Sequence, residues 1–415
     1  MSRLLLRMQA LERACRRARC RVHGSDCSPR RLLVVVLLLL GMGLAACGSA
    51  APAARDTADA RFSAADRSSA TPPAVAPVAP ADIDALFADI AADEPGVALV
   101  VMHDGAVIYE QGYGVTALTT GQPITPETSF HIGSSGKQFT GLAVMLLAEA
   151  DQLAYDDPIT DYLPELETLE EVPTIRQVLQ HTAGIPDYDE DLLDEYDMPD
   201  NEDALAWLAY EGAVEFTPGS QFAYSNAGYE VLGTLVERIS DQRFADFLHT
   251  EVFEPLAMDH SFSLPNPQRL SDPQRARGYA VDASGTFTLD DSDPLDGLVG
   301  SGSVYASAHD LGRYMDALLA SELVSAATLE AGLRPAILND GTVSPYGFGW
   351  DVITTDLGPT IGHSGAWQGF LSHIAHFQDA DLTVIVLTNR TDRDPEDDAF
   401  EIATRYLAHS PTTPR

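Results

Sequence analysis

Residues 130–137 read Phe-His-Ile-Gly-Ser-Ser-Gly-Lys and lead into the apolar segment 138–150, QFTGLAVMLLAEA. We expect a helix to begin near Ser134, which places Ser134 and Lys137, three positions apart, on the same helical face. The N-terminus of a helix also favours negative charge that develops at a serine. Because a buried amine with a lowered pKa can take the proton of a hydroxyl, this segment predicts a serine nucleophile with a lysine base.

The lysine in this segment has no second copy in the chain. Of the 25 Lys and Arg residues, Lys137 is the only lysine. An arginine, whose guanidinium stays protonated, could not act as a base at this position. Taken alone, the Ser-x-x-Lys spacing is equally well explained by coincidence, because serine is a common residue.

Two further motifs follow in order. They are Tyr224-Ser225-Asn226 and the His-x-Gly sequence within Gly362-His363-Ser364-Gly365-Ala366-Trp367-Gln368-Gly369-Phe370. Ser-x-x-Lys, Tyr-x-Asn and His-x-Gly in this order resemble the serine β-lactamase and penicillin-binding-protein superfamily. The resemblance is closest to the branch that holds class C β-lactamases, D-Ala-D-Ala carboxypeptidases, D-aminopeptidases and esterases. It covers about Ala81 to Leu407 and includes LQHTAGIP (179–186), NAGY (226–229), FEPLAM (253–258) and GSVY (302–305).

The resemblance implies how protons are handled. Ser134 would be the nucleophile that becomes acylated, without a cofactor or a metal. Lys137 and Tyr224 would form the proton-handling pair, with Tyr224 as general base for acylation and for the deacylating water. The reference pKa of tyrosine is about 10, so its anion would need the positive charge of Lys137 nearby.

The resemblance also implies a set of substrate-binding groups, namely Asn226, His363, Ser364, Gly365 and Ala366. Asn226 would hydrogen-bond the acyl side of the substrate. His363 replaces the lysine of the Lys-Thr-Gly motif and should lie on a strand edge beside Tyr224.

An oxyanion hole is implied as well. The backbone N–H groups of Ser134 and Ala366 would form it. Gly365 would let the substrate backbone approach the strand closely.

Strands are predicted at both ends of the chain, and helices between them. Apolar runs predict strands at 97–102, 107–112, 360–362, 370–377 and 382–388, and His103-Asp104-Gly105 is a hairpin signature. Amphipathic helices are expected at 83–92 and 397–407. The five strands predict one antiparallel sheet built from both termini, in an α+β, β-lactamase/transpeptidase-like fold. Flanking helices and a mostly helical inserted lobe, roughly 140–300, would complete it.

The first 46 residues are typical of an export signal. Arg30 and Arg31 precede the apolar run 32–40, which is too short for a permanent membrane span. The following Leu44-Ala45-Ala46-Cys47 resembles the lipobox of bacterial lipoproteins, in which the cysteine is lipidated. A signal peptide with a chance cysteine is the alternative interpretation.

The lipobox interpretation divides the chain into three parts. We expect a lipoprotein signal peptide at 1–46, an Ala/Pro-rich tether at 47–80 that starts at lipidated Cys47, and a serine hydrolase domain at 81–410. The expected protein is an exported, monomeric lipoprotein of the cell envelope that reaches the membrane through its N-terminal lipid. All four cysteines lie within the first 47 residues, so no disulfide framework is expected.

Charge and spacing exclude other classes of partner. The 62 acidic and 25 basic residues give a formal net charge of −37, which repels nucleic acid. His373 and His376 would face opposite sides of a strand, so they do not predict a metal site. The acidic run 187–203 lacks the spacing of a calcium-binding hand and is interpreted as a solvated loop.

A rival nucleophile is Ser364, because residues 362–366 nearly match the Gly-x-Ser-x-Gly elbow of α/β-hydrolases. That motif needs a strand, a sharp turn and then a helix. Since residues 370–377 predict a further strand, the sequence favours Ser134.

The substrate class rests on the charge of the site. Resembling carboxypeptidases place an arginine about a dozen residues before His-x-Gly, whereas no arginine occurs here between Arg334 and Arg390. A site without that cation should favour neutral esters or amides over anions. Esterase-type hydrolysis is therefore the first hypothesis. The second is a β-lactamase, D-Ala-D-Ala carboxypeptidase or D-aminopeptidase, and the third is an inactive binding lipoprotein.

Overall fold

The computed structural model describes residues 75–187, 192–193, 196, 198–265 and 267–407, all within one compact unit, Phe62–Arg415. The other unit, Met1–Arg61, lies outside the described residues, and so do the predicted signal peptide, Cys47 and most of the predicted tether. No helix among the described residues has both the length and the apolar character needed to cross a membrane.

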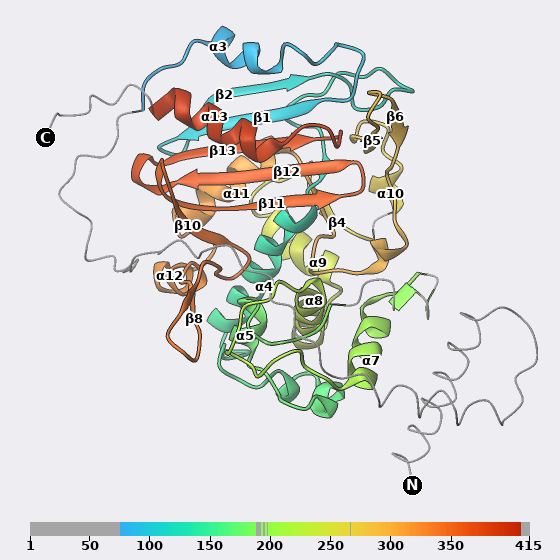
Figure 1. The fold of residues 1–415 in the computed structure, drawn as a ribbon, viewed down its shortest axis with the longest axis vertical. Coiled ribbons are helices and arrows are strands. Elements are labelled where there is room, and N and C mark those ends of the chain that lie inside the picture. Colours follow the sequence, from blue (N-terminus) through green and yellow to red (C-terminus); the bar gives the residue numbers. More distant parts are fainter. Residues whose placement is uncertain (1–74, 188–191, 194–195, 197, 266, 408–415) are drawn as a thin grey trace, which may run out of the picture. The chain divides into compact units, whose positions relative to one another are not determined.

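A six-stranded antiparallel sheet forms the centre of the fold (Figure 1). Its order is β10-β11-β12-β13-β1-β2, so strands from the two ends of the described chain meet between β13 and β1. The strands are β1 (Val97–His103), β2 (Ala106–Tyr113), β10 (Asp351–Thr355), β11 (Gly358–Trp367), β12 (Phe370–Phe377) and β13 (Leu382–Thr388). The predicted α+β fold, with a sheet built from both termini, is confirmed.

The sequence prediction missed β10 and shortened β11. β10 is an edge strand whose residues are only partly buried, so its apolar pattern is weak. The hairpin between β1 and β2 was predicted correctly. Asp104 and Gly105 have φ values of 50° and 73°, the left-handed conformation that a two-residue hairpin turn requires.

Helices cover both faces of the sheet. On one face α13 (Pro395–Leu407) packs on β12 and β13, and on the other α11 (Ala308–Leu319) packs on β1 and β13 (Figure 1). β1 is buried on both faces, and its side chains alternate between the two cores. The helix predicted at 83–92 is shorter than expected, since only α3 (Pro80–Asp84) and a 3-10 turn at Ala85–Phe87 form.

Helices and short strands connect the two halves of the sheet. The helices are α4 (Lys137–Glu149), α5 (Ile175–Leu179), α7 (Asn201–Glu211), α8 (Asn226–Ser240), α9 (Phe244–Leu248), α10 (Pro267–Leu270) and α12 (Ala326–Gly332). The short strands are β3 (Phe130–His131), β4 (Phe262–Ser263), β5 (Tyr279–Val281), β6 (Phe287–Leu289), β7 (Val304–Ala306), β8 (Ala336–Ile337) and β9 (Val343–Ser344). α4 is buried on almost every side and packs against α8, which brings the start of each helix to one place.

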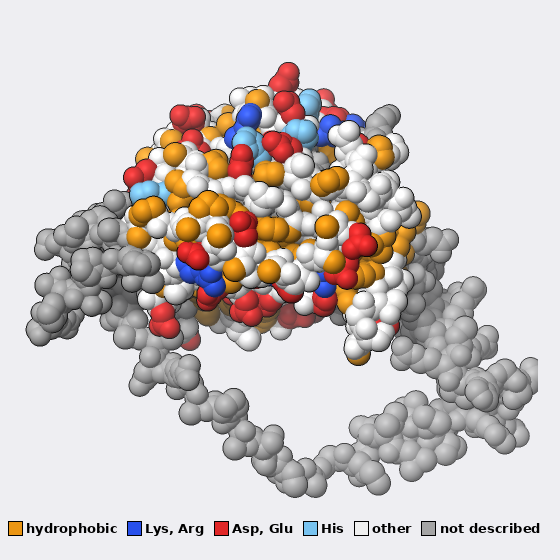
Figure 2. Space-filling model, turned by 90° about the horizontal axis from the view of Figure 1, so that it is seen from above, with side chains coloured by type: hydrophobic (Ala, Val, Ile, Leu, Met, Phe, Trp, Pro, Cys, Tyr) orange, Lys and Arg blue, Asp and Glu red, His pale blue; other side chains and the backbone are white. Residues whose placement is uncertain are grey.

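The surface reflects the acidic composition. Figure 2 shows carboxylates spread among apolar side chains over the face above α3 and β2, with Lys and Arg side chains only in small groups. Several of the described arginines form ion pairs with these carboxylates, such as Arg393 with Asp398 at 2.6 Å.

Candidate active site

Ser134 and Lys137 meet where α4 begins. Ser134 lies in a 3-10 turn, Gly133–Gly136, and Lys137 is the first residue of α4. The Lys137 Nζ donates to Ser134 Oγ at 3.3 Å, to Asn226 Oδ1 at 2.7 Å and to the carbonyl oxygen of Ser301 at 2.7 Å. The three contacts fix the lysine amine beside the serine hydroxyl.

The environment of Lys137 lowers the pKa of its amine. Its side chain is fully buried, and this burial lowers its pKa to about 7, although the carboxyls of Glu230 and Asp187 act in the opposite direction. Near neutral pH a substantial fraction of the amine is therefore unprotonated and able to accept the Ser134 proton.

Tyr224 completes the predicted catalytic trio. Lys137 Nζ lies 4.7 Å from the centre of the Tyr224 ring, and the Ser134 hydroxyl is near enough to the Tyr224 hydroxyl to affect its pKa. Tyr224 is 40% exposed, but the protein around its ring still raises the pKa of the hydroxyl, and the nearby Ser134 hydroxyl lowers this pKa only in part. In the free protein Tyr224 therefore keeps its proton, and this favours Lys137 rather than Tyr224 as the base.

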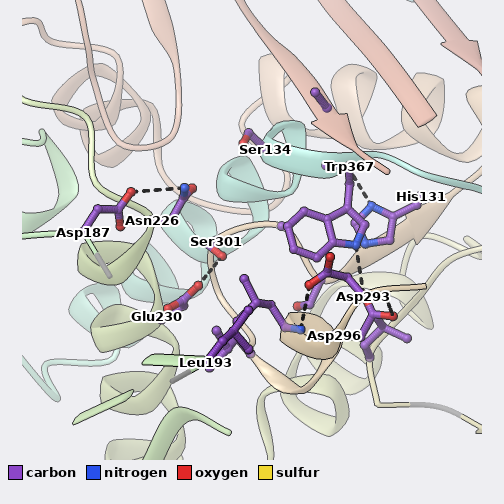
Figure 3. A pocket seen from close by; sticks show the side chains of 17 residues that line it. His131, Ser134, Asp187, Leu193, Asn226, Glu230, Asp293, Asp296, Ser301 and Trp367 are labelled. Carbon is purple, nitrogen blue, oxygen red and sulfur yellow. Dashed lines mark hydrogen bonds between the residues drawn. The ribbon is translucent and has the colours of Figure 1, made fainter. Parts of the chain in front are cut away.

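Asn226 is held from both sides at the start of α8. Its Oδ1 accepts from Lys137, and its Nδ2 donates to Asp187 Oδ2 at 3.3 Å (Figure 3). Asp187 also accepts from the backbone N–H of Ala227 at 2.8 Å, at the end of the helix where negative charge is favoured. Asp187 uses one of the two N–H donors of Asn226 Nδ2, which leaves the second donor for a substrate.

His363 lies on β11 beside Tyr224, with 6.2 Å between the ring centres. Its Nδ1–H donates to the Ser364 carbonyl at 2.5 Å, so its Nε2 accepts from the Tyr346 hydroxyl at 2.9 Å. Burial, reinforced by the charge of Lys137, lowers the pKa of His363 to about 3. His363 is thus a neutral residue at the place where related motifs carry a cation.

Ser364 and Gly365 differ from their expected roles. The Ser364 hydroxyl donates to Glu396 on α13 at 2.8 Å and lies 2.9 Å from Nδ1 of His373, so it does not join the group around Ser134. A Cβ at Gly365 would lie 2.0 Å from the Ile132 carbonyl oxygen. The glycine is needed because β11 packs against the segment that carries Ser134, not to admit a substrate.

Ala366 lies close to the turn that carries Ser134. A Cβ at Gly133 would lie 2.6 Å from the backbone nitrogen of Ala366, so that nitrogen lies close to the turn that carries Ser134. Both Ser134 and Ala366 line the same cavity.

This cavity has a volume of about 340 Å³ and opens beside Ser134 (Figure 3). Its apolar wall consists of Leu193, Leu264, Leu295, Leu298 and Trp367. Its carboxyl groups are those of Asp187, Glu230, Asp293 and Asp296. Among the described residues that line it there is no lysine or arginine. The cavity is therefore partly apolar and otherwise acidic.

Glu230 and Ser301 are two of the lining residues that the sequence prediction missed. Glu230 follows Asn226 by four positions on α8, a spacing that places both side chains on one helical face and could have revealed it. Ser301 carried no signal, because it contributes its carbonyl oxygen to Lys137 and its hydroxyl to Glu230 from an irregular segment.

His181 has a structural place beside the site. Its Nδ1 accepts from the backbone N–H of Ser225 at 3.1 Å, and its ring lies 4.3 Å from that of Tyr224. Burial moves the pKa of His181 well below its usual value, so the ring stays neutral and supports the Tyr-x-Asn segment.

The fold, together with a serine, a lysine and a tyrosine in contact, defines a serine hydrolase of the β-lactamase and penicillin-binding-protein type. Residues 83–407 match the protein family described as Beta-lactamase, and the chain belongs to this family. This confirms the superfamily that the three motifs predicted.

Individual relatives agree with this assignment. Penicillin-binding protein 4* of Bacillus subtilis (strain 168) is 32% identical over 321 residues, which cover 74% of this chain and 69% of that protein. Protein flp of Staphylococcus aureus (strain MW2) is 26% identical, and the match covers 71% of this chain and 59% of flp.

Solved structures share the fold. An octameric penicillin-binding protein homologue from Pyrococcus abyssi superimposes with a TM-score of 0.70 at 26% identity, over 80% of this chain and 78% of that one. A penicillin-binding protein from Bacillus halodurans gives a TM-score of 0.65 at 26% identity, over 77% and 98%. The oligomeric state of the present chain stays a prediction.

Proposed function

We propose that this protein hydrolyses ester or amide bonds through an acyl-enzyme on Ser134. The observation that carries the proposal is the Lys137 amine, fully buried, 3.3 Å from Ser134 Oγ and with its pKa lowered to about 7. An amine in this state can accept a proton from a serine hydroxyl at neutral pH.

In the proposed acylation, neutral Lys137 takes the Ser134 proton while Oγ attacks the substrate carbonyl. The negative charge that develops on the carbonyl oxygen is stabilised by the N–H groups of Ser134 and Ala366. Tyr224, whose hydroxyl lies near that of Ser134, passes the proton from Lys137 to the leaving oxygen or nitrogen. The bond to the leaving group breaks, and the acyl group stays on Ser134.

Deacylation reverses the proton path. A water molecule gives its proton through Tyr224 to Lys137, and its oxygen attacks the acyl carbonyl. The bond to Ser134 breaks, and Oγ recovers the proton from Lys137. The acid product leaves, and the enzyme returns to its starting state.

We propose neutral esters and amides as substrates ahead of anionic ones. His363 is neutral, and the described lining of the cavity carries four carboxyl groups but no arginine or lysine. A substrate carboxylate would meet repulsion there. The second candidate is hydrolysis of β-lactams or D-alanyl peptides, and the names of the penicillin-binding relatives favour it.

The test is mass spectrometry of the full chain after brief incubation with a fluorophosphonate, with p-nitrophenyl butanoate and with benzylpenicillin. We expect an adduct on Ser134 that is absent in Ser134→Ala and retained in Ser364→Ala, the rival serine whose hydroxyl contacts α13. Which acyl donor turns over separates the two substrate classes. Folded wild-type protein that gains no adduct from any reagent would leave a binding function instead.

We also propose that the chain is exported and anchored by lipid on Cys47. The support is the lipobox-like sequence 44–47 after an apolar run. Metabolic labelling with a fatty-acid probe should mark the wild-type chain and not Cys47→Ser. Equal labelling of both would refute the anchor without touching the hydrolase proposal.

A further inference from the structure

One carboxyl group in the cavity has an unmet hydrogen-bonding capacity. Glu230 is 4% exposed, and its Oε1 accepts from the Ser301 hydroxyl at 2.7 Å (Figure 3). Its Oε2 is buried and has no hydrogen-bond partner among the described residues. A buried carboxyl oxygen without a hydrogen-bond partner is unfavourable, so this position calls for a partner that the described chain does not supply, and in the ionised form that partner must be a donor.

The other three carboxyls of the cavity are already engaged. Asp187 accepts from Asn226 and from the N–H of Ala227. The other two form the cap of a short turn. Asp293 accepts from Leu295 and Gln368, and Asp296 accepts from Asp293 and Trp367. Glu230 is therefore the member of this set that is open to a ligand.

Among the described residues no cation forms a hydrogen bond with Glu230 Oε2. The three N–H bonds of a protonated Lys137 are directed to Ser134, Asn226 and Ser301. No arginine occurs in the sequence between Arg176 and Arg238, so the loop after Asp187 supplies none either. Lys137 therefore acts on Glu230 only through its charge, and a cation that bonds Oε2 would have to arrive with the substrate.

We propose that Glu230 forms a subsite that binds the protonated amino group of a substrate, so that the preferred acyl donors are amino-acyl esters or amides. This inference rests on the proposed hydrolase function and names its substrate class. The apolar wall of the cavity would hold the carbon chain between the reacting carbonyl and the amino group. The ammonium would donate to Oε2, and Ser301 would keep Oε1 in place.

The ionisation of Glu230 makes ammonium binding at the subsite depend on pH. Burial raises the pKa of Glu230 to about 8, the charge of Asp187 adds to this, and Ser301 and Lys137 act against it. These groups face Glu230 from α4 and from the irregular segments that carry Asp187 and Ser301. The ionised form that pairs with an ammonium therefore increases as the pH rises towards 8. Preference for an amino-acyl substrate should increase with it.

The test compares p-nitrophenyl esters in which only the terminal group changes. β-Alanyl and 6-aminohexanoyl esters are each paired with the ester in which a methyl group replaces the ammonium, butanoyl and heptanoyl. The quantity measured is the ratio of kcat/KM within each pair, from pH 6 to pH 8. In wild type at least one ratio should rise with pH, and Glu230→Gln should lower it by roughly tenfold or more and remove the rise.

Glu237→Gln is the matched control, because Glu237 is a half-buried carboxyl on the same helix that accepts from the backbone N–H of Phe244 outside the cavity. It should keep the wild-type ratio. Ratios that are equal in wild type and Glu230→Gln, while the neutral esters turn over, would overturn the subsite and leave the hydrolase intact.

If the hydrolase proposal is wrong, no ester acylates Ser134, and this result differs from equal ratios with turnover of the neutral esters. A binding measurement then tests the subsite without catalysis, and it remains possible if Glu230→Gln does not fold. Hexylammonium chloride should raise the melting temperature of wild type and of Ser134→Ala more than 1-hexanol does. Equal shifts with the two compounds would refute the subsite.

Discussion

The two faces of the central sheet are built differently. Under α13 the core consists of aliphatic and aromatic side chains such as Ile402, Phe377 and Val384, all of them fully or almost fully buried. Between α4 and α8 the protein buries Lys137, Gln138 and Glu230 in addition to apolar side chains. Burial of apolar side chains stabilises both regions, but in the second region burial also lowers the pKa of Lys137, raises that of Glu230 and leaves polar atoms without partners among the described residues. The comparison separates the part that holds the fold from the part that performs chemistry.

The largest expected effect is a loss of activity from a change in the region between α4 and α8. Lys137→Arg keeps a cation but removes the base, and we expect kcat/KM for an ester to fall about a thousandfold. In wild type the neutral amine is the active form, so kcat/KM should be lost as the pH falls through about 7, the pKa of Lys137. A pH profile from 5 to 9 tests this, and activity that stays level down to pH 5 would contradict it.

The apolar side should affect stability without affecting catalysis. Ile402→Ala removes a fully buried side chain from α13, and the free energy of unfolding should fall by about 2–5 kcal/mol. Below the melting temperature kcat/KM should stay within about twofold of wild type, because no residue of α13 lines the cavity. Urea unfolding and ester hydrolysis on the same sample measure both. A parallel loss of activity would contradict the prediction that the α13 side affects stability and not catalysis.

The smallest expected effect is an increase in the free energy of unfolding. Gln138 is fully buried, and neither its Nε2 nor its Oε1 has a partner among the described residues. Gln138→Met keeps the volume and removes the unpaired amide, so the free energy of unfolding should rise by about 1–2 kcal/mol. Urea unfolding measures this too, with Ile402→Ala as the reference for a loss. A destabilised Gln138→Met protein would show that the amide has a partner in solution.

The sequence predicted the sheet well where apolar runs end in turns. β12 and β13 begin and end at the predicted residues, because both are buried strands with a turn between them. β10 escaped prediction since an edge strand needs little apolar character. The helix at 83–92 was predicted too long, because its apolar pattern continues past the 3-10 turn that ends at Phe87.

The site was predictable where a motif fixes neighbours on a helix. Ser134, Lys137 and Asn226 come together as the motifs implied. On β11 the prediction was wrong for Ser364, because adjacent residues of a strand face opposite sides of the sheet and only His363 faces the site. Ser301 could not be predicted, since no local pattern connects it to α4 or α8.

The pairing of β1 with β13 has a consequence for how the chain folds. Gly96 donates to the Asn389 side chain across a separation of 293 residues, at the end of this pair. Contacts of such range form late and slowly, because a long loop must close before they contribute. The last strand synthesised is also an inner strand of the sheet, between β12 and β1. A chain that ends before Leu382 would expose the unpaired edges of β12 and β1, so the sheet is complete only after residues up to Thr388 have been synthesised.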